Sequence, residues 1–338
     1  MATLDTAPER IVVAHTAPLG EVLFATPLIR VLKLAWPAAH LTLVSAPEVA
    51  ALAGCVPGVD RVLALSTRGG LSALRRVARE LGEPQLVLVP NVSLRNAALA
   101  WLTKAQVRVG GDLSLLRRFF TVRVPVKTRE PFVQRAMDLA RALGIEGPTD
   151  LQLAAPPAEL EAARGQLGDE PSLGLVLAAE GPTRRWPPGS FALLAEQARE
   201  AGLRPVLLGD PDDRDDRDAA EAVKAKARVP LLDMTGAGLL PTVAAMALMR
   251  AVVGGDTALS HAARALGTPA LLLFGPTDPG AHTLEHHAQA LRLGLDCQPC
   301  GSAGAKLCPF AHHDCLRKLE ADRVWNAVVH LLAREGRQ

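Results

Sequence analysis

The chain of 338 residues has no tyrosine, and only 3% of its residues are aromatic. Proteins that bind single-stranded nucleic acid stack the bases on aromatic side chains, so this composition argues against a nucleic-acid partner. Long apolar runs are missing as well, because no segment approaches the ~20 apolar residues that a membrane-spanning helix needs. The N-terminus does not resemble a signal peptide, since Asp5 and Glu9 precede a short predicted strand that begins at Ile11. We therefore expect a cytoplasmic protein.

Cysteine is scarce, with five residues in the chain, and four of them lie close together. That distribution does not match the dispersed disulfide framework of a secreted protein. The spacing is Cys297-x2-Cys300-x7-Cys308-x6-Cys315, and thiolates at the first spacing can share one tetrahedral ion. The second pair is spaced more widely than in the commonest zinc motifs. A structural metal such as zinc, disulfides and free thiols therefore all stay open, and none of them makes the cluster catalytic.

The formal net charge is only +2, but it is unevenly distributed along the chain. Residues 1–150 carry a net charge of +6, and the remainder carries −4. The excess is greatest from Arg61 to Arg141, which contains 15 basic and five acidic residues. A basic region of this size favours an acidic partner, although an arginine-rich solvated surface would give the same count.

Short runs of leucine and β-branched residues alternate with helical stretches along the chain. The first half predicts strands at 11–14, 41–44 and 86–89, and helices at about 21–35 and 71–81. The second half predicts strands at 173–177, 205–208 and 251–253, and a helix at 190–201. This alternation is typical of α/β folds with parallel sheets.

The length exceeds the usual size of one domain, so two domains are expected. The proline-rich, weakly patterned segment 147–171 is the best candidate for a linker. We place the domains at 1–160 and 161–338, each a doubly wound parallel sheet. Ligands bind beyond the carboxyl ends of the strands in such sheets, which makes the loops there candidate sites.

The stretch from Gly254 to Pro279 combines a strand, a helix start and a second strand. Asp256 and Thr257 are good N-cap residues, residues 258–266 have helical spacing, and Gly267 supplies the helix stop. The free N–H groups and the positive dipole end of this helix would attract a phosphate. The alternative is an ordinary strand–helix–strand unit, since most such units bind nothing at that end.

The loop after the first strand, 15–21, lacks the G-x-G-x-x-G fingerprint of a dinucleotide-binding fold. Glu21, at the start of the next helix, is either a carboxylate that interacts favourably with the helix dipole or a general base near an acceptor hydroxyl. The loop after strand 173–177 carries Arg184 and Arg185, which either clamp a diphosphate or lie on the surface.

Taken together, several short segments make the chain resemble glycosyltransferase family 9, the ADP-heptose:lipopolysaccharide heptosyltransferases. The resemblance runs nearly from end to end, and the combination of Asp-Thr, His and Gly-Pro-Thr is its most specific part. The matching segments are Pro18–Val22 with Thr26-Pro27, Thr183–Pro187, Gly209, Thr235-Gly236, Gly255–Thr257, His261 and Phe274–Pro279.

The resemblance implies a GT-B fold, in which an N-terminal acceptor domain and a C-terminal nucleotide-sugar domain face a cleft, with the last helix packing back on the N-terminal domain. It also implies transfer of a heptose, with inversion, from a donor such as ADP-heptose to an anionic glycolipid or core oligosaccharide of lipopolysaccharide. The protein would then contact the inner face of the inner membrane peripherally. No cofactor is required, because arginine and a helix dipole can neutralise the departing diphosphate.

By the same resemblance, Glu21 stands where the family has an aspartate that acts as the base, and Arg184 stands where it has a lysine. Asp256 and Thr257 match the family's Asp-Thr-Gly, but Ala258 replaces the glycine, and its methyl group could crowd a phosphate. The other donor-site candidates are Arg185, Thr235, Gly236 and His261.

The roles of two further residues are read from their positions. His261 either contacts the sugar or diphosphate or packs as a half-buried side chain, and Asp278 is expected to cap a turn. The departures at Glu21 and Ala258 also keep open a catalytically weakened family member that acts as a glycan-binding or accessory protein. A nicotinamide-dependent oxidoreductase is disfavoured, because the glycine fingerprint is missing.

Overall fold

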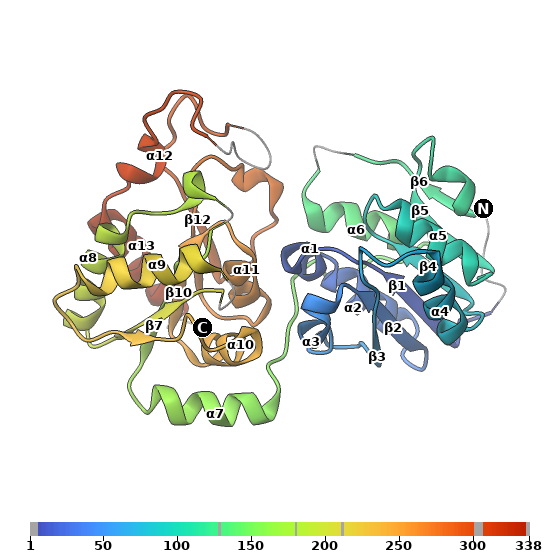
Figure 1. Cartoon of the computed structure of the whole chain (residues 1–338), viewed down its shortest axis with the longest axis horizontal. Helices are drawn as coiled ribbons and strands as arrows, with labels where there is room; N and C mark the ends of the chain where they lie inside the picture. The colour runs from blue at the N-terminus through green and yellow to red at the C-terminus, as the bar shows by residue number, and fades with distance from the viewer. Residues whose placement is uncertain (1–5, 128–129, 180, 211–212, 301–306, 336–338) are drawn as a thin grey trace. The chain divides into compact units, whose positions relative to one another are not determined.

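The computed structural model describes residues 6–127, 130–179, 181–210, 213–300 and 307–335. It divides into two compact units, 1–154 and 155–338. Each unit is built around a six-stranded parallel sheet that is covered by helices (Figure 1). The expected α/β class with two doubly wound sheets is therefore confirmed. Within the described ranges, no helix is both long and apolar enough to cross a membrane.

The first sheet has the strand order β3-β2-β1-β4-β5-β6. Its strands are β1 (Arg10–Ala14), β2 (His40–Ser45), β3 (Arg61–Ala64), β4 (Leu86–Val89), β5 (Val107–Gly111) and β6 (Val122–Val124). The helices of this unit are α1 (Leu19–Phe24), α2 (Thr26–Ala35), η1 (Pro47–Val49), α3 (Ala50–Ala53), α4 (Leu71–Leu81), α5 (Leu94–Leu102), η2 (Arg117–Phe119) and α6 (Phe132–Arg141). The strand order reverses between β1 and β4, so the loops after these two strands flank the switch point of the sheet.

The second sheet has the equivalent order β12-β11-β10-β7-β8-β9, with its switch point between β7 and β10. Its strands are β7 (Ser172–Val176), β8 (Arg204–Leu208), β9 (Leu232–Asp233), β10 (Ala251–Gly255), β11 (Ala270–Leu273) and β12 (Ala288–Leu291). The helices of this unit are α7 (Pro157–Leu167), η3 (Pro182–Arg184), α8 (Pro188–Glu200), α9 (Arg214–Lys224), α10 (Leu239–Leu248), α11 (Ala258–Ala265), η4 (Pro279–Ala281), α12 (Asp314–Arg317) and α13 (Ala321–Glu335).

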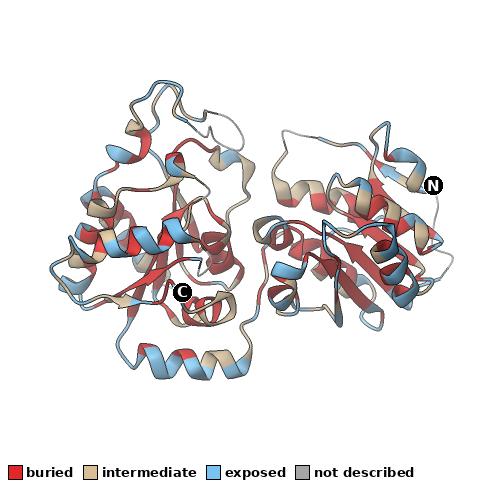
Figure 2. Ribbon diagram, in the orientation of Figure 1, coloured by how far each residue is buried: buried red, intermediate tan, exposed pale blue. Residues whose placement is uncertain are grey.

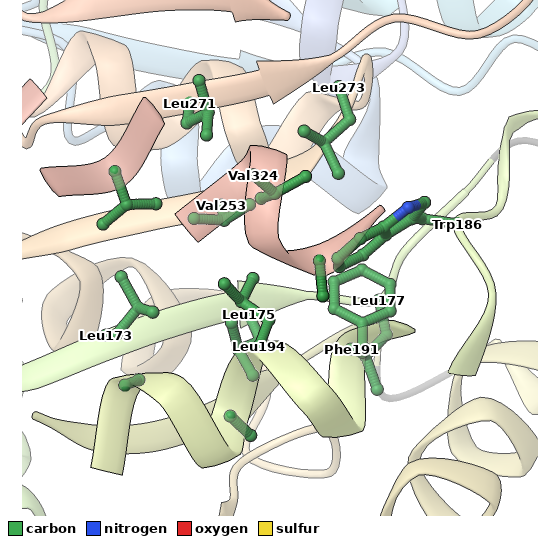
Figure 3. Close-up of a cluster of buried hydrophobic side chains, with 14 of the residues drawn as sticks. Leu173, Leu175, Leu177, Trp186, Phe191, Leu194, Val253, Leu271, Leu273 and Val324 are labelled. Atoms are coloured by element: carbon green, nitrogen blue, oxygen red, sulfur yellow. The ribbon is translucent and has the colours of Figure 1, made fainter. Parts of the chain in front are cut away.

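The central strands are buried on both faces, which explains their continuous apolar sequences (Figure 2). In the second unit, Leu175 of β7 and Val253 of β10 form part of one buried apolar cluster with Trp186 and Phe191 (Figure 3). The α13 helix adds Val324 to this cluster and packs against α8 and the strands β10 to β12. The apolar face of the last helix is therefore used within the second unit.

Two expectations about helices are wrong in detail. The predicted helix at 21–35 is two helices, α1 and α2, which are interrupted at Ala25. Pro27 lacks the N–H that a continuous helix would use, and the Thr26 hydroxyl donates a hydrogen bond of 2.7 Å to the Leu23 carbonyl at the break. The predicted linker 147–171 does contain the division between the two units, after Ala154, but it also contains the helix α7, which packs against α10. Only Ala163 and Leu167 of α7 are buried, so its apolar pattern in the sequence is weak.

Candidate functional site

The junction of β10 and α11 has the predicted form. Strand β10 ends at Gly255, and α11 begins at Ala258 with Thr257 in the N-cap position. Thr257 makes no side-chain capping bond, which leaves the first-turn N–H groups of α11 able to bind an anion. A Cβ atom at Gly254 would lie 2.6 Å from the Ser260 hydroxyl oxygen. Glycine at this position therefore lets the helix start lie directly against the strand end.

Asp256, in the turn between β10 and α11, accepts hydrogen bonds from two histidines. Its Oδ1 atom lies 2.9 Å from Nε2 of His261, on α11, and 3.1 Å from Nε2 of His282, which follows η4. Both imidazole side chains are nearly fully buried, and their ring centroids are 4.5 Å apart. The carboxylate is therefore fixed from two directions, by the helix α11 and by the segment after η4.

Arg264, one turn further along α11, determines the tautomer of His261. Its Nη1 atom lies 2.7 Å from Nδ1 of His261, and a guanidinium can only donate. Nδ1 therefore accepts, and the proton on Nε2 is donated to Asp256. Arg264 is fully buried, donates from Nε to Glu285 at 2.9 Å, and donates from Nη2 to the carbonyl of Thr283.

This network sets the charges at the start of α11. Burial lowers the pKa of His261 to about 3, so the ring is neutral at physiological pH. Burial alone would raise the pKa of Asp256, but the hydrogen bonds from His261 and His282 hold it far below its usual range. The expectation of a half-buried packing histidine is replaced by a fully buried one with defined hydrogen bonds.

Asp256, His261 and His282 also bring three potential metal-ligand atoms within 4.8 Å of one another. A metal ion needs the lone pair of an unprotonated imidazole nitrogen. Nε2 of His261 has no such lone pair while Arg264 donates to Nδ1. The donor set therefore fits a hydrogen-bond network that orients a carboxylate, and it does not fit a metal.

The sequence did not point to His282, Arg264 or Glu285 as parts of this site. Their contacts join α11 to the loop after β11, which lies about twenty residues away in the chain. The one available signal was a charged residue in the middle of an apolar helix. Arg264 in α11 requires a buried partner, because an unpaired buried charge is strongly unfavourable.

The loop after β7 is anchored by the residues that surround Arg184. The Arg185 guanidinium lies 2.9 Å from Oδ1 of the buried Asp216 and donates to the Leu177 carbonyl at 2.8 Å. The indole nitrogen of Trp186 donates to the Leu319 carbonyl at 2.9 Å. A Cβ atom at Gly255 would lie 3.2 Å from the Arg184 carbonyl oxygen, so this loop crosses the end of β10. Arg185 therefore has a structural partner, and its neighbour Arg184 is held beside the start of α11.

The other expected donor-site residues follow β9 at the same edge of the sheet. Thr235 donates from its backbone N–H and its hydroxyl to Oδ1 of Asp233, at 3.0 and 2.7 Å. A Cβ atom at Gly209 would lie 3.2 Å from Thr235, so the loops after β8 and β9 pack on one another. The carboxylate of Asp278 accepts a bond of 2.9 Å from the Gly280 N–H, which confirms its expected turn-capping role.

The switch point of the first unit contains a cavity of about 410 Å³. It is bordered by the loops after β1 and β4, by the end of β6 and by α6. Glu21 lies at its margin with an exposed side chain in the first turn of α1, which begins at Leu19, two residues earlier than expected. The predicted base thus borders a space that is large enough for a sugar-sized group.

Two polar side chains of this cavity have atoms without hydrogen-bond partners among the described residues, Nδ1 of His15 and Nε of Arg135. His15 donates from Nε2 to the Glu21 carbonyl at 3.0 Å, so Nδ1 carries a lone pair. Burial lowers the pKa of His15, which favours the neutral ring. Arg135 lies 4.5 Å over the ring of Phe132, and burial lowers its pKa although the charge of Glu21 acts in the opposite direction. Besides the Glu21 carboxylate and the Asn91 amide, which also line the cavity, His15 therefore offers an acceptor and Arg135 a cationic donor to a ligand.

The four clustered cysteines are free thiols in the structure. Burial raises the pKa of Cys315 and that of Cys300. At Cys300 the charges of the neighbouring thiols raise the pKa as well. The backbone N–H groups of residues 310–313, that of His313 foremost, lower the pKa of Cys308 and so favour its thiolate. The segment 301–306, between Cys300 and Cys308, lies outside the described residues.

Two Rossmann-like sheets, each with polar side chains at its switch point, give this chain the GT-B fold. The chain belongs to glycosyltransferase family 9 (heptosyltransferase), whose model matches residues 74–310. It is 25% identical to lipopolysaccharide heptosyltransferase 2 of Salmonella typhimurium, over 97% of this chain and 99% of that one. It is 29% identical to lipopolysaccharide heptosyltransferase 1 of Pseudomonas aeruginosa, over 92% and 90%. The solved E. coli ADP-heptose lps heptosyltransferase II has the same fold, with a TM-score of 0.81 at 22% identity and coverage of 97% and 99%.

Proposed function

We propose that this glycosyltransferase transfers a heptose from ADP-heptose to the inner core of lipopolysaccharide, with inversion at the anomeric carbon. The relatives' names support the donor and acceptor classes. The single observation that carries the mechanism is the position of the Glu21 carboxylate at the margin of the first-unit cavity. A carboxylate there can accept the proton of an acceptor hydroxyl that enters the cavity.

The reaction then needs one base and one site for a leaving group. Glu21 takes the proton of the acceptor hydroxyl as that oxygen attacks the anomeric carbon, and the bond from this carbon to the diphosphate breaks. The negative charge that develops on the diphosphate is stabilised by Arg184 and by the N–H groups of Thr257 and Ala258 at the start of α11. Attack on the face opposite the leaving group inverts the configuration, and no metal ion is required.

The remaining donor-site residues act as supports in this proposal. Arg185 and Trp186 hold the loop that carries Arg184. Asp256 is ionised and would repel a phosphate, so its second oxygen, Oδ2, would accept a hydrogen bond from a sugar hydroxyl, while His261 fixes the orientation of the carboxylate through Oδ1. Thr235 and Gly236 would contact the nucleotide from the loop after β9.

The acceptor is an anionic glycolipid or core oligosaccharide. Arg135 places a cationic group in the cavity beside Glu21, with Nε unpaired among the described residues. A carboxylate or phosphate on the acceptor would complete its hydrogen bonds. The neutral His15 would accept a bond from a neighbouring hydroxyl through Nδ1.

A thermal-shift panel tests the donor class. ADP and ADP-heptose are expected to raise the unfolding temperature more than uridine or guanosine nucleotides at equal concentration, because only ligands that bind the folded state stabilise it. A preference for uridine or guanosine nucleotides contradicts the proposed donor. Absence of turnover with several nucleotide sugars, despite nucleotide binding, favours a binding or accessory role instead.

We also propose that the thiols of Cys297, Cys300, Cys308 and Cys315 hold a structural zinc ion. The lowered pKa of Cys308 suits a metal-bound thiolate, but among the described residues no three of these sulfur atoms lie within 4.8 Å of one another, so the ion would have to draw them together. The four sulfur atoms come from the described segments on either side of 301–306 and from α12, so the ion would link these segments. Metal analysis of protein purified without added metal is expected to find one zinc per chain, and Cys308→Ser should remove it. Protein without stoichiometric metal contradicts this assignment.

A further inference from the structure

The helix α5 carries large apolar side chains on its outward face. Leu94 and Trp101 are 57% and 56% exposed, and they stand one above the other at helical spacing with Ala98 between them. Leu71, at the start of the neighbouring α4, is 53% exposed. Single exposed apolar residues are ordinary, but a row of them along one face marks an interaction surface.

The helices α4 and α5 pack side by side on one face of the first sheet (Figure 1). Their N-terminal ends meet where Arg95 donates to the Gly69 carbonyl. Towards their C-terminal ends, Arg75 and Arg79 line a shallow pocket together with residues 102–104. The outward side chains of α4, which are Leu71, Arg75 and Arg79, therefore lie beside those of α5, which are Leu94 and Trp101. We call this combined face the α4–α5 surface, and it consists of Leu71, Arg75, Arg79, Leu94 and Trp101.

This surface has an excess of positive charge. Within the described ranges neither Arg75 nor Arg79 forms an ion pair. Of the nearby acidic residues, Glu80 is paired with Arg61, and Glu83, which lines the same pocket, is paired with Lys104. Arginines beside exposed leucine and tryptophan fit a bilayer interface, where the arginines meet lipid phosphates and the apolar side chains enter the headgroup region. A protein partner would need acidic residues facing the arginines and a shaped apolar pocket for Trp101. An anionic bilayer supplies both properties without a specific shape.

We propose that the α4–α5 surface docks this protein on the surface of an anionic phospholipid bilayer. The inference deepens the proposed function, on which it rests for the lipid nature of the acceptor, and it names the residues that make the membrane contact. Trp101 and Leu94 enter the headgroup region, and Arg75 and Arg79 contact phosphates. Docking brings the unit that contains the Glu21 cavity to the membrane surface, where a glycolipid acceptor is concentrated.

The test is sedimentation of the full-length protein with vesicles of phosphatidylethanolamine and phosphatidylglycerol, compared with vesicles of phosphatidylcholine. The unmodified protein is expected to bind the anionic vesicles, and added salt should weaken this binding. The variant Arg75→Ala/Arg79→Ala should bind about thirtyfold more weakly at low salt. The variant Leu94→Ser/Trp101→Ser should bind about tenfold more weakly and should lose the blue shift of tryptophan fluorescence on binding.

Matched controls come from the second unit. Leu193→Ser removes a leucine of α8 that is equally exposed, at 55%, and Lys226→Ala/Arg228→Ala removes the same two positive charges from another exposed region. Both controls should bind within about twofold of the unmodified protein. Equal losses in the controls, no loss in the α4–α5 variants, or no binding by the unmodified protein overturns the proposal.

The same variants separate this inference from the proposed function. With a water-soluble acceptor fragment, the α4–α5 variants should turn over as fast as the unmodified protein. With the glycolipid acceptor in vesicles, they should be slower in proportion to their lost binding. If no acceptor is used at all but the vesicle pattern holds, the proposed function fails and the docking surface stands.

Discussion

The two sheets have the same strand order, yet their switch points are built in opposite ways. In the first unit the site is a cavity, and the described part of the chain leaves Nδ1 of His15 and Nε of Arg135 without partners. In the second unit, Asp256, His261 and Arg264 satisfy one another around a buried ion pair. One fold thus supports both a site with polar atoms that can still bind a ligand and a site whose charged groups are already oriented before the ligand binds.

The largest expected effect is that of Glu21→Gln in the first unit, which tests whether the open cavity holds the catalytic base. Turnover should fall by about 10²- to 10⁴-fold, because the amide cannot take up the acceptor proton. The side chain is exposed, so the unfolding temperature and the donor affinity should not change. Steady-state kinetics with saturating donor measure the effect.

Two companion variants control this experiment. Glu21→Asp keeps a carboxylate and should retain much of the turnover. Glu48→Gln changes another exposed glutamate of the same unit and should be neutral. Full turnover in Glu21→Gln would transfer the role of base to another group, and the lone pair of His15 would be the first candidate.

In the second unit, Asp256→Asn removes the charge on which the network is centred. The carboxylate accepts two hydrogen bonds, so we expect a loss of about 2 kcal/mol in the free energy of unfolding. Donor kcat/KM should fall about a hundredfold, because the remaining oxygen no longer accepts strongly from the sugar. Urea titration and kinetics give the two values, and unchanged kinetics in a destabilised variant would leave Asp256 with a structural role only.

The pH dependence of stability should also separate the two sites. The folded protein holds the pKa of His261 near 3, below its ordinary value of 6.5, so the unfolded chain binds more protons below about pH 6.5. Stability is therefore complete above that pH and decreases as the pH falls, by about 2 kcal/mol on reaching about pH 5.

The matched variant is His261→Gln. Its amide N–H can donate to Asp256 and its oxygen can accept from Arg264, but it does not titrate. The slope of stability between about pH 6.5 and 5 should decrease in this variant, with a remainder from the buried His15. An unchanged slope in His261→Gln would contradict the burial of a neutral imidazole.

The smallest expected effect belongs to Ala258→Gly, at the first position of α11. If the methyl group crowds the diphosphate, its removal should lower the KM for the donor by about threefold. The helix should lose at most ~1 kcal/mol of stability, because glycine is a poor helix former. A raised KM would show instead that the methyl group helps to order the helix start.

Local signals in the sequence identified the elements around both sites. The junction of β10 and α11 was predicted because an apolar strand, N-cap residues and a terminal glycine occur together within a few residues. The break at Ala25 was missed although Thr26-Pro27 is a local signal, since the apolar spacing continues across it. The α7 helix was missed because it packs with only one narrow face, and Pro157 at its first position suggested a linker.

The interior of the donor site could not be predicted in this way. His282 and Glu285 contact α11 only because the loop after β11 folds over it, and no periodicity encodes such a contact. The charge state of Asp256 likewise depends on burial and on two neighbours from different segments. The tautomer of His261 depends on Arg264, whose guanidinium direction is a property of the packed structure.

The arrangement around Asp256 has a consequence for calorimetry. Asp256 keeps its charge and His261 keeps its single proton through the whole physiological pH range, so neither group exchanges protons with the solvent when the donor binds. If no other group changes its protonation, the heat of donor binding should be the same in PIPES and in Tris buffer, whose ionisation enthalpies differ widely. Asp256 and His261 would then neither take up protons from the buffer nor release protons to it when the charged donor binds.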